Sequence, residues 1–252
     1  MKAIKFILPF ILFLLFLSCN GKGTPEKPNK IVCVLFDLSE TTNTPEIRKT
    51  YLNRFKFVLD RMQVGDAIEA ALITEKSVSE LNLSIECEFP VIKNKIGTEL
   101  FEKKYKVLAD SILDMKKDSL LKVADSVLFK PKRKILNTEI ISSLQVAERV
   151  FKSFPQPRKI LVVFSDMIED SKHYNFEREN LSSQRINQII NREKKDNLLP
   201  NISGVKIYVA GATAKDSERY NNIKNFWFEY FKNCNANLES QNYGAALIKF
   251  DE

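Results

Sequence analysis

The residues best suited to chemistry follow an apolar segment near the start of the chain. Residues 31–36 are rich in Val, Ile and Phe, which predicts a buried strand, and the sequence DLSET follows at once over residues 37–41. Asp37, Ser39 and Thr41 thus stand at the carboxyl end of a strand, where α/β proteins gather ligands. Hard oxygen atoms of this kind suit a hard cation. The alternative is that these residues only cap the next helix and close a turn.

Two later segments supply side chains of the same kind. Thr138 stands at the start of a helix predicted over residues 137–151, and Asp166 follows a strand predicted over residues 159–164. With right-handed crossovers, both positions fall at the edge of the sheet where Asp37 is placed. The sequence therefore predicts one cluster, made of Asp37, Ser39, Thr41, Thr138 and Asp166.

The elements that would position this cluster alternate between strand and helix patterns. Strands are predicted over residues 31–36, 67–74, 81–91, 159–164, 205–210 and 245–250. Helices are predicted over residues 45–62, 99–129, 137–151, 182–194 and 217–231, the first with Thr44 as its cap. The short polar link between the second and third strands predicts a hairpin. The alternation indicates an α/β fold with a doubly wound, mostly parallel sheet and helices on both faces.

The helical region over residues 99–129 is longer than a crossover requires, so we expect it to be an insertion. Lys116, Lys117 and Asp118 suggest a break between two helices. Two roles stay open for this region. Its outer face contacts a partner or covers the sheet edge, or it is an amphipathic helix pair that simply packs on the sheet.

The order of these motifs resembles the von Willebrand factor A domain over most of residues 30–250. The shared features are a strand followed by D-x-S-x-T, a distant Thr at a helix start, and a strand followed by Ser-Asp. The resemblance implies a metal-ion-dependent adhesion site that holds one divalent cation, Mg²⁺ first, with Mn²⁺ or Ca²⁺ as alternatives. The residues it implies for this site are Asp37, Ser39, Thr41, Thr138 and Asp166.

The same resemblance implies roles for the ligands. Ser39 and Thr41 would bind the cation directly, and Thr138 or Asp166 would act directly or through water. An open coordination position would accept an acidic side chain from a protein partner. The chain departs from the family at Asn137 and Met167, where the family usually or often has Gly, and Glu40 adds a carboxylate that would compete with an acidic ligand.

An enzyme is the competing interpretation. Asp37 after a strand and the acidic run after Asp166 are also similar to phosphatases of the haloacid dehalogenase type, which use an aspartyl nucleophile and a second Asp two residues later. Ser39 occupies that second position and cannot act as the general acid. The chain has no Gly-rich phosphate loop, and its one histidine, His173, excludes most His-based catalysis. We therefore expect no enzyme; a structural protein with no metal role is the third possibility.

The first residues predict a secreted, anchored protein. Lys2 and Lys5 precede an apolar stretch over residues 6–17, which is too short to cross a bilayer and is typical of a signal peptide. Residues 16–19, Phe-Leu-Ser-Cys, resemble a bacterial lipobox, which implies cleavage before Cys19 and its lipidation; an unmodified Cys19 after ordinary cleavage is the alternative. The expected organisation is a signal peptide (1–18), a tether (19–30) and one domain (31–252), anchored in the bacterial cell envelope, at the outer membrane.

Net charge and cysteine spacing limit the classes of partner and of metal site that we expect. The formal net charge is +7, but basic and acidic residues are interspersed, so no nucleic-acid partner is expected. The expected partners are a protein that offers an acidic side chain and the membrane that holds lipidated Cys19. Cys33, Cys87 and Cys234 match no zinc-binding spacing, and either a Cys33–Cys87 disulfide or free thiols would fit the sequence.

Overall fold

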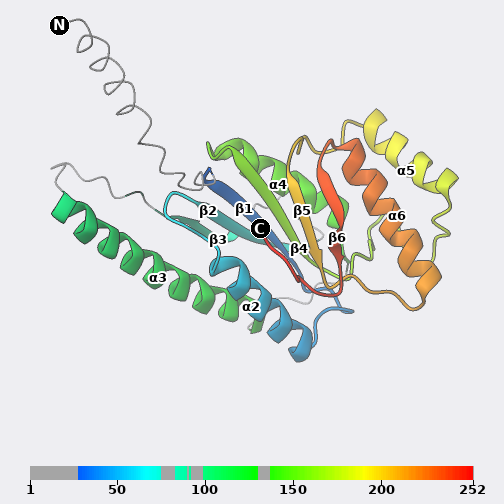
Figure 1. The fold of residues 1–252 in the computed structure, drawn as a ribbon. Coiled ribbons are helices and arrows are strands. Elements are labelled where there is room, and N and C mark those ends of the chain that lie inside the picture. Colours follow the sequence, from blue (N-terminus) through cyan, green and yellow to red (C-terminus); the bar gives the residue numbers. More distant parts are fainter. Residues whose placement is uncertain (1–27, 75–82, 90, 92–98, 130–136, 252) are drawn as a thin grey trace, which may run out of the picture.

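A six-stranded sheet forms the centre of the molecule in the computed structural model, which describes residues 28–74, 83–89, 91, 99–129 and 137–251 (Figure 1). The strands run in the order β3-β2-β1-β4-β5-β6, and only β3 is antiparallel to its neighbour. Their bounds are β1 Lys30–Asp37, β2 Ala67–Ile73, β3 Leu83–Glu88, β4 Arg158–Phe164, β5 Lys206–Ala210 and β6 Asn237–Gly244. The predicted signal peptide and most of the tether lie outside the described residues.

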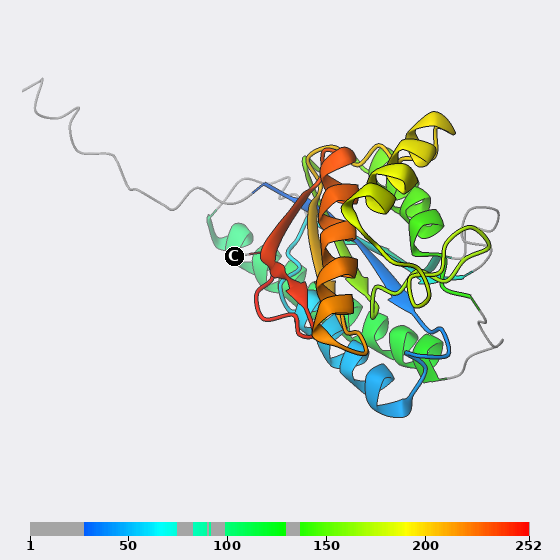
Figure 2. The same ribbon diagram turned by 90° about the vertical axis from the view of Figure 1, so that its right-hand side faces the viewer.

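Helices cover both faces of the sheet, as Figures 1 and 2 show. Those on one face are α2 (Pro45–Leu59) and α3 (Glu99–Phe129). Those on the other face are α4 (Ile140–Ser153), α5 (Ser183–Lys195) and α6 (Ser217–Asn233). Strand β1 is buried on both sides, and its alternate residues enter two separate cores, with Cys33 on the α4 side and Val34 on the α2 side. The predicted α/β fold is confirmed, because such two-sided burial produces the continuous apolar runs seen in the sequence.

The last strand differs from the prediction. Residues 245–250 form no strand; the edge strand β6 is the more polar segment Asn237–Gly244. An edge strand needs only one buried face, so its sequence carries a weaker apolar signal than a central strand. Phe250 is fully buried for a different reason, because its ring packs 5.2 Å from that of Tyr208 on the α2 face.

One further expectation is corrected, and one alternative that the sequence left open is decided. Helix α3 is continuous over 31 residues, with no break at Lys116–Asp118, since lysine is a good helix former and this stretch lies on the helix surface. Cys33, Cys87 and Cys234 are free thiols. A Cys33–Cys87 bridge is excluded because β2 lies between β1 and β3, which separates the two backbones by about 10 Å, beyond disulfide reach. Within the described residues, none of the helices combines the length and apolarity that a bilayer span needs.

Gly211 allows β5 to end close to the loop that follows β4. Its φ is +115°, and a Cβ atom there would lie 2.8 Å from the backbone oxygen of Ser165. Backbone is the hardest neighbour to move, so this close approach needs glycine both for its torsion angle and for space.

Gly211→Ala should therefore lower the free energy of unfolding by about 2–4 kcal/mol, because strain and a backbone clash add together. Gly204→Ala is the matched control, since Gly204 also has a positive φ (+73°) but a Cβ atom there would meet nothing within 4 Å. The control should cost about 1 kcal/mol. Denaturant unfolding of both variants measures the difference, and equal losses would contradict the proposed clash.

Candidate functional site

The carboxylate of Asp37 is held at the carboxyl end of β1 by two hydrogen bonds. The backbone N–H of Ser39 donates to Oδ1 at 2.9 Å, and the hydroxyl of Ser165 donates to Oδ2 at 2.7 Å. The side chain is fully buried. Burial raises the pKa of Asp37, although these donors oppose the rise. The side chain of Asp37 is therefore fixed in position beneath the loop and exposes neither oxygen to solvent.

The hydroxyl groups of the DLSET segment gather above Asp37. Ser39 Oγ lies 3.3 Å from Thr41 Oγ1 and 3.3 Å from Thr42 Oγ1. Thr42, which sequence reasoning missed, donates to the carbonyl oxygen of Asp37 at 2.9 Å and so closes the loop. These residues do not cap α2, because its cap is Thr44, whose Oγ1 accepts from Ile47 N at 3.3 Å.

Asp166 completes the contact between the loops after β1 and β4. Its Oδ2 accepts a hydrogen bond from Thr41 Oγ1 at 2.7 Å, and its Oδ1 accepts from the N–H of Ile168 at 2.9 Å. Burial, followed by the charge of Asp37, raises the pKa of Asp166 to about 7. The structure thus brings Asp37, Ser39, Thr41 and Asp166 together, as the sequence predicts.

Thr138 is placed differently. Its backbone pairs with that of Asp170, with Thr138 N to Asp170 O at 2.9 Å and Asp170 N to Thr138 O at 3.0 Å. It therefore lies beside the loop that carries Asp166 and outside α4, which begins at Ile140. No hydrogen bond joins its side chain, which is buried, to the other four predicted residues.

Glu169 is a site residue that the sequence analysis did not identify. Its carboxylate accepts from the N–H of Ile141 at 3.0 Å, so it satisfies the start of α4 in place of Glu139, the residue at the cap position, which makes no such bond. Burial raises the pKa of Glu169 to about 8. The only signal in the sequence is the acidic run after Asp166, which does not reveal a contact with a helix 28 residues away.

Met167 stands at a position where the von Willebrand factor A domain, which the sequence resembles, often has glycine. Its φ is +67°, the left-handed conformation that glycine adopts most readily. The strained backbone is held on both sides, because its N–H donates to Ser165 Oγ and its carbonyl accepts from Trp227 Nε1, each at 2.9 Å. The methionine side chain is fully buried. Met167 therefore adopts a backbone conformation that favours glycine without being glycine.

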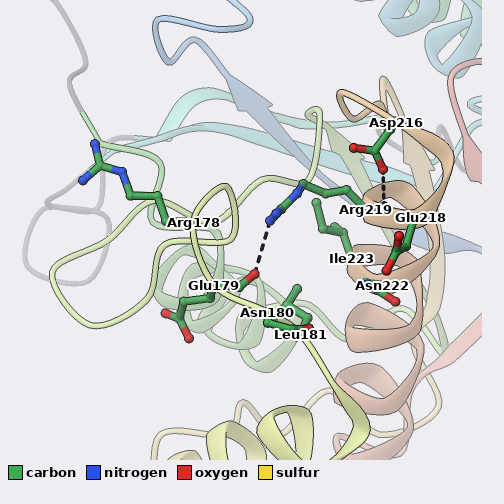
Figure 3. A pocket seen from close by; sticks show the side chains of 9 residues that line it. All are labelled: Arg178, Glu179, Asn180, Leu181, Asp216, Glu218, Arg219, Asn222 and Ile223. Atoms are coloured by element: carbon green, nitrogen blue, oxygen red, sulfur yellow. Dashed lines mark hydrogen bonds between the residues drawn. The ribbon is translucent and has the colours of Figure 1, made fainter.

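A hollow of about 610 Å³ adjoins the cluster, and Thr41 and Asp166 form part of its wall. Arg54, Lys215 and Glu177 are the charged residues on its other sides. A smaller hollow of about 270 Å³ lies between residues 178–181 and the start of α6 (Figure 3). It shares no lining residue with the first, and Arg219 spans it to donate to the carbonyl oxygen of Glu179.

The oxygen atoms of the cluster suit a small divalent cation. Octahedral Mg²⁺ with bonds of about 2.1 Å places neighbouring ligand oxygens about 3 Å apart. The Ser39–Thr41 and Thr41–Asp166 oxygen pairs are separated by 3.3 and 2.7 Å. Among the described residues no Lys, Arg or His forms an ion pair with Asp37 or Asp166, so their charge is not balanced by protein. In that part of the chain no three or more His, Cys, Asp or Glu side chains are grouped so that they could hold a metal ion by themselves, so any cation here would depend on hydroxyl ligands.

Asp166→Asn should stabilise the protein in a chelating buffer at pH 8. In the folded parent Asp166 keeps its proton up to about pH 7, while in the unfolded chain it loses it near pH 4, so its contribution to stability falls as the pH rises between these values. The Asn side chain does not ionise, so the variant does not lose this stability as the pH rises. It should be about 1–3 kcal/mol more stable than the parent at pH 8, with little gain at pH 4. Denaturant unfolding at both pH values checks this, with exposed Asp60→Asn as the control; a gain independent of pH would contradict it.

Comparison with known proteins gives similarity of fold only. No protein-family model matches the chain, and no curated protein matches it. Among solved structures, it is similar to the PilB minor pilin from Streptococcus sanguinis (10% identity, TM-score 0.45, covering 84% of this chain and 63% of that one). It is also similar to proximal thread matrix protein 1 from the mussel byssus (12% identity, TM-score 0.38, covering 82% of this chain and 45% of that one). A third similar structure is a von Willebrand factor type A protein from Catenulispora acidiphila (9% identity, TM-score 0.36, covering 82% of this chain and 43% of that one). The chain thus spans less than two thirds of each of these proteins, and at such TM-scores they carry no argument about function.

Proposed function

We propose that this protein binds a divalent cation, Mg²⁺ first, at the loops after β1 and β4, and binds an acidic side chain of a protein partner through it. The observation that carries the proposal is the pair of buried carboxylates, Asp37 and Asp166, joined to the hydroxyls of Ser39 and Thr41 without a basic residue in ion-pair contact among the described residues. A bound cation would supply the missing positive charge and favour ionised Asp166.

Each residue has a distinct role in this proposal. Ser39 and Thr41 bind the cation with their hydroxyl oxygens, and Asp166 binds it directly or through water. Asp37 already accepts two hydrogen bonds, so it supplies charge from beneath and orients Ser39. Thr138 acts through water, because it lies beside the Asp166 loop without a hydrogen bond to the cluster. With both carboxylates ionised the site and its divalent cation are neutral together, so a further carboxylate would bind through an open coordination position of the cation.

The hollow beside Thr41 and Asp166 gives the partner a route to the cation. Its 610 Å³ is enough for an acidic side chain and adjoining backbone. Arg54 and Lys215 on its wall favour an anionic ligand, while Glu177 opposes one. A partner that presents an isolated Asp or Glu fits this balance better than a highly acidic segment.

The geometry supports binding over catalysis. An aspartyl nucleophile needs an oxygen that can reach its substrate, but Asp37 is fully buried and both of its oxygens accept hydrogen bonds. Ser39 cannot replace the carboxylic acid that would protonate a leaving group. We therefore do not propose phosphoryl transfer, and the following experiment includes a phosphate ester so that such an activity would be detected.

Asp37→Ala and Asp166→Ala should each weaken Mg²⁺ binding by at least about tenfold, because neutral hydroxyls alone compete poorly with water for this ion. Calorimetric titration of the full chain with Mg²⁺, Mn²⁺ and Ca²⁺ measures this, and circular dichroism checks folding. Asp60→Ala, on the exposed surface of the same molecule, should change nothing. A parent that binds none of these ions at millimolar concentration, or Asp37-dependent turnover of a phosphate ester, would refute the proposal.

We also propose that the domain is held at the bacterial cell envelope by a lipid on Cys19. Cys19→Ser should move the protein from the membrane fraction to the soluble fraction, or leave the signal uncleaved, because several acyl chains together give firm anchoring. Intact-mass measurement of the parent should show added acyl groups, and Cys87→Ser should fractionate like the parent. Membrane retention of Cys19→Ser, with an unmodified parent mass, would contradict the anchor.

A further inference from the structure

Helix α3 has two halves with different surroundings. In its C-terminal half Leu120, Ala124 and Leu128 are buried in the core between the sheet and α2. In its first seventeen residues Leu108 and Met115 are exposed, at 49% and 62% of their surface. Figure 1 shows α3 lying beside α2 and continuing past it. Leu108 and Met115 are more exposed than Val123 and Phe129, the exposed apolar residues of the C-terminal part, which are at 39% and 38%.

Four apolar residues of this stretch have the spacing of a coiled-coil seam. Tyr105, Leu108, Ile112 and Met115 are separated by three, four and three residues, which are alternating a and d positions of a heptad. Tyr105 and Ile112 are half-buried, whereas Leu108 and Met115 are exposed. Two apolar positions in every heptad are the pattern that a second helix covers.

We propose that this seam binds the same seam of a second copy of the chain, with the two α3 helices antiparallel. Aligning the helices about residue 110 pairs Tyr105 with Met115 of the second copy and Leu108 with its Ile112, and the symmetry repeats both pairs. All four layers are then apolar. The small residues Ala109 and Ser111 flank the two-fold axis and allow close approach.

Charge at the edges of the seam favours this partner and this direction. Lys104 and Asp118 both occupy g positions, and in an antiparallel pair g faces g. Lys104 of each copy then lies opposite Asp118 of the other, and both residues are exposed. In a parallel pair g faces e, so Lys104 would face Ala109 and Ser111 would face Lys116, with no opposite charges. The seam is therefore complementary to itself only when antiparallel.

The seam is short, so the dimer is weak, with a dissociation constant on the order of micromolar. This proposal is independent of the cation site, because no residue of the seam belongs to that cluster. A result that refutes the dimer would therefore not refute the cation site, and the reverse also holds.

Sedimentation equilibrium of the full chain in a density-matched mild detergent tests the proposal, from about 1 to 300 µM. The parent should show a monomer–dimer equilibrium, and Leu108→Glu should weaken it by at least about tenfold. Lys104→Glu and Asp118→Lys should each weaken it about three- to tenfold, because each places like charges opposite one another twice. Asp110→Lys, on the outer f position, is the matched control and should leave the equilibrium unchanged.

The charge variants also identify the partner. The double variant Lys104→Glu/Asp118→Lys should dimerise like the parent, and an equimolar mixture of the two single variants should form a mixed dimer. Recovery of this kind is expected only when two copies of this chain meet antiparallel. The proposal would be overturned by a parent that is monomeric at all concentrations. It would also be overturned if the double variant dimerised as weakly as the single variants while circular dichroism showed a folded protein. Either result would mean that the seam does not bind a second copy of this chain.

Discussion

The candidate site depends on two hydrogen bonds that join the end of β1 and its loop to the loop after β4. Ser165 Oγ donates to Asp37 Oδ2 at 2.7 Å. Thr41 Oγ1 donates to Asp166 Oδ2 at 2.7 Å, and this second bond links residues 125 positions apart in the chain. It also holds a buried carboxylate near Asp37, a second buried carboxylate, whose charge helps to raise the pKa of Asp166 to about 7. Two ionised carboxylates in a dry environment are costly, so Asp166 keeps its proton up to about pH 7, and a bound cation would favour its ionised form.

Three other elements hold the loop after β4 in place, and so keep the buried carboxylate of Asp166 close to that of Asp37. Trp227 of α6 donates to the carbonyl of Met167, which fixes a backbone with positive φ. Glu169 accepts from the first turn of α4, and Gly211 at the end of β5 leaves room for Ser165. The helices of one face of the sheet therefore determine the position of Asp166 before any ligand arrives, which reduces the ordering cost of binding.

The protein keeps its two candidate interaction surfaces separate. The cation site lies in loops that the sheet aligns, so its geometry depends on the whole core. The seam of α3 lies on one helix, so it depends on heptad spacing and on anchoring of the C-terminal half by Leu120, Ala124 and Leu128. A change at the seam should therefore leave the cluster of Asp37 and Asp166 intact, and the reverse holds as well.

The sequence by itself determined the elements whose signals are local: the buried run of β1, the Thr44 cap and Pro45 start of α2, and the placement of Asp37 and Asp166 after parallel strands. Periodicity and capping act within a few residues, so they can be read directly. Only the tertiary structure decided that β6 is the polar segment before residue 245, that Glu169 caps α4, and that Thr138 pairs with Asp170. These features arise from contacts between distant segments and from the needs of an edge strand, for which no local pattern exists.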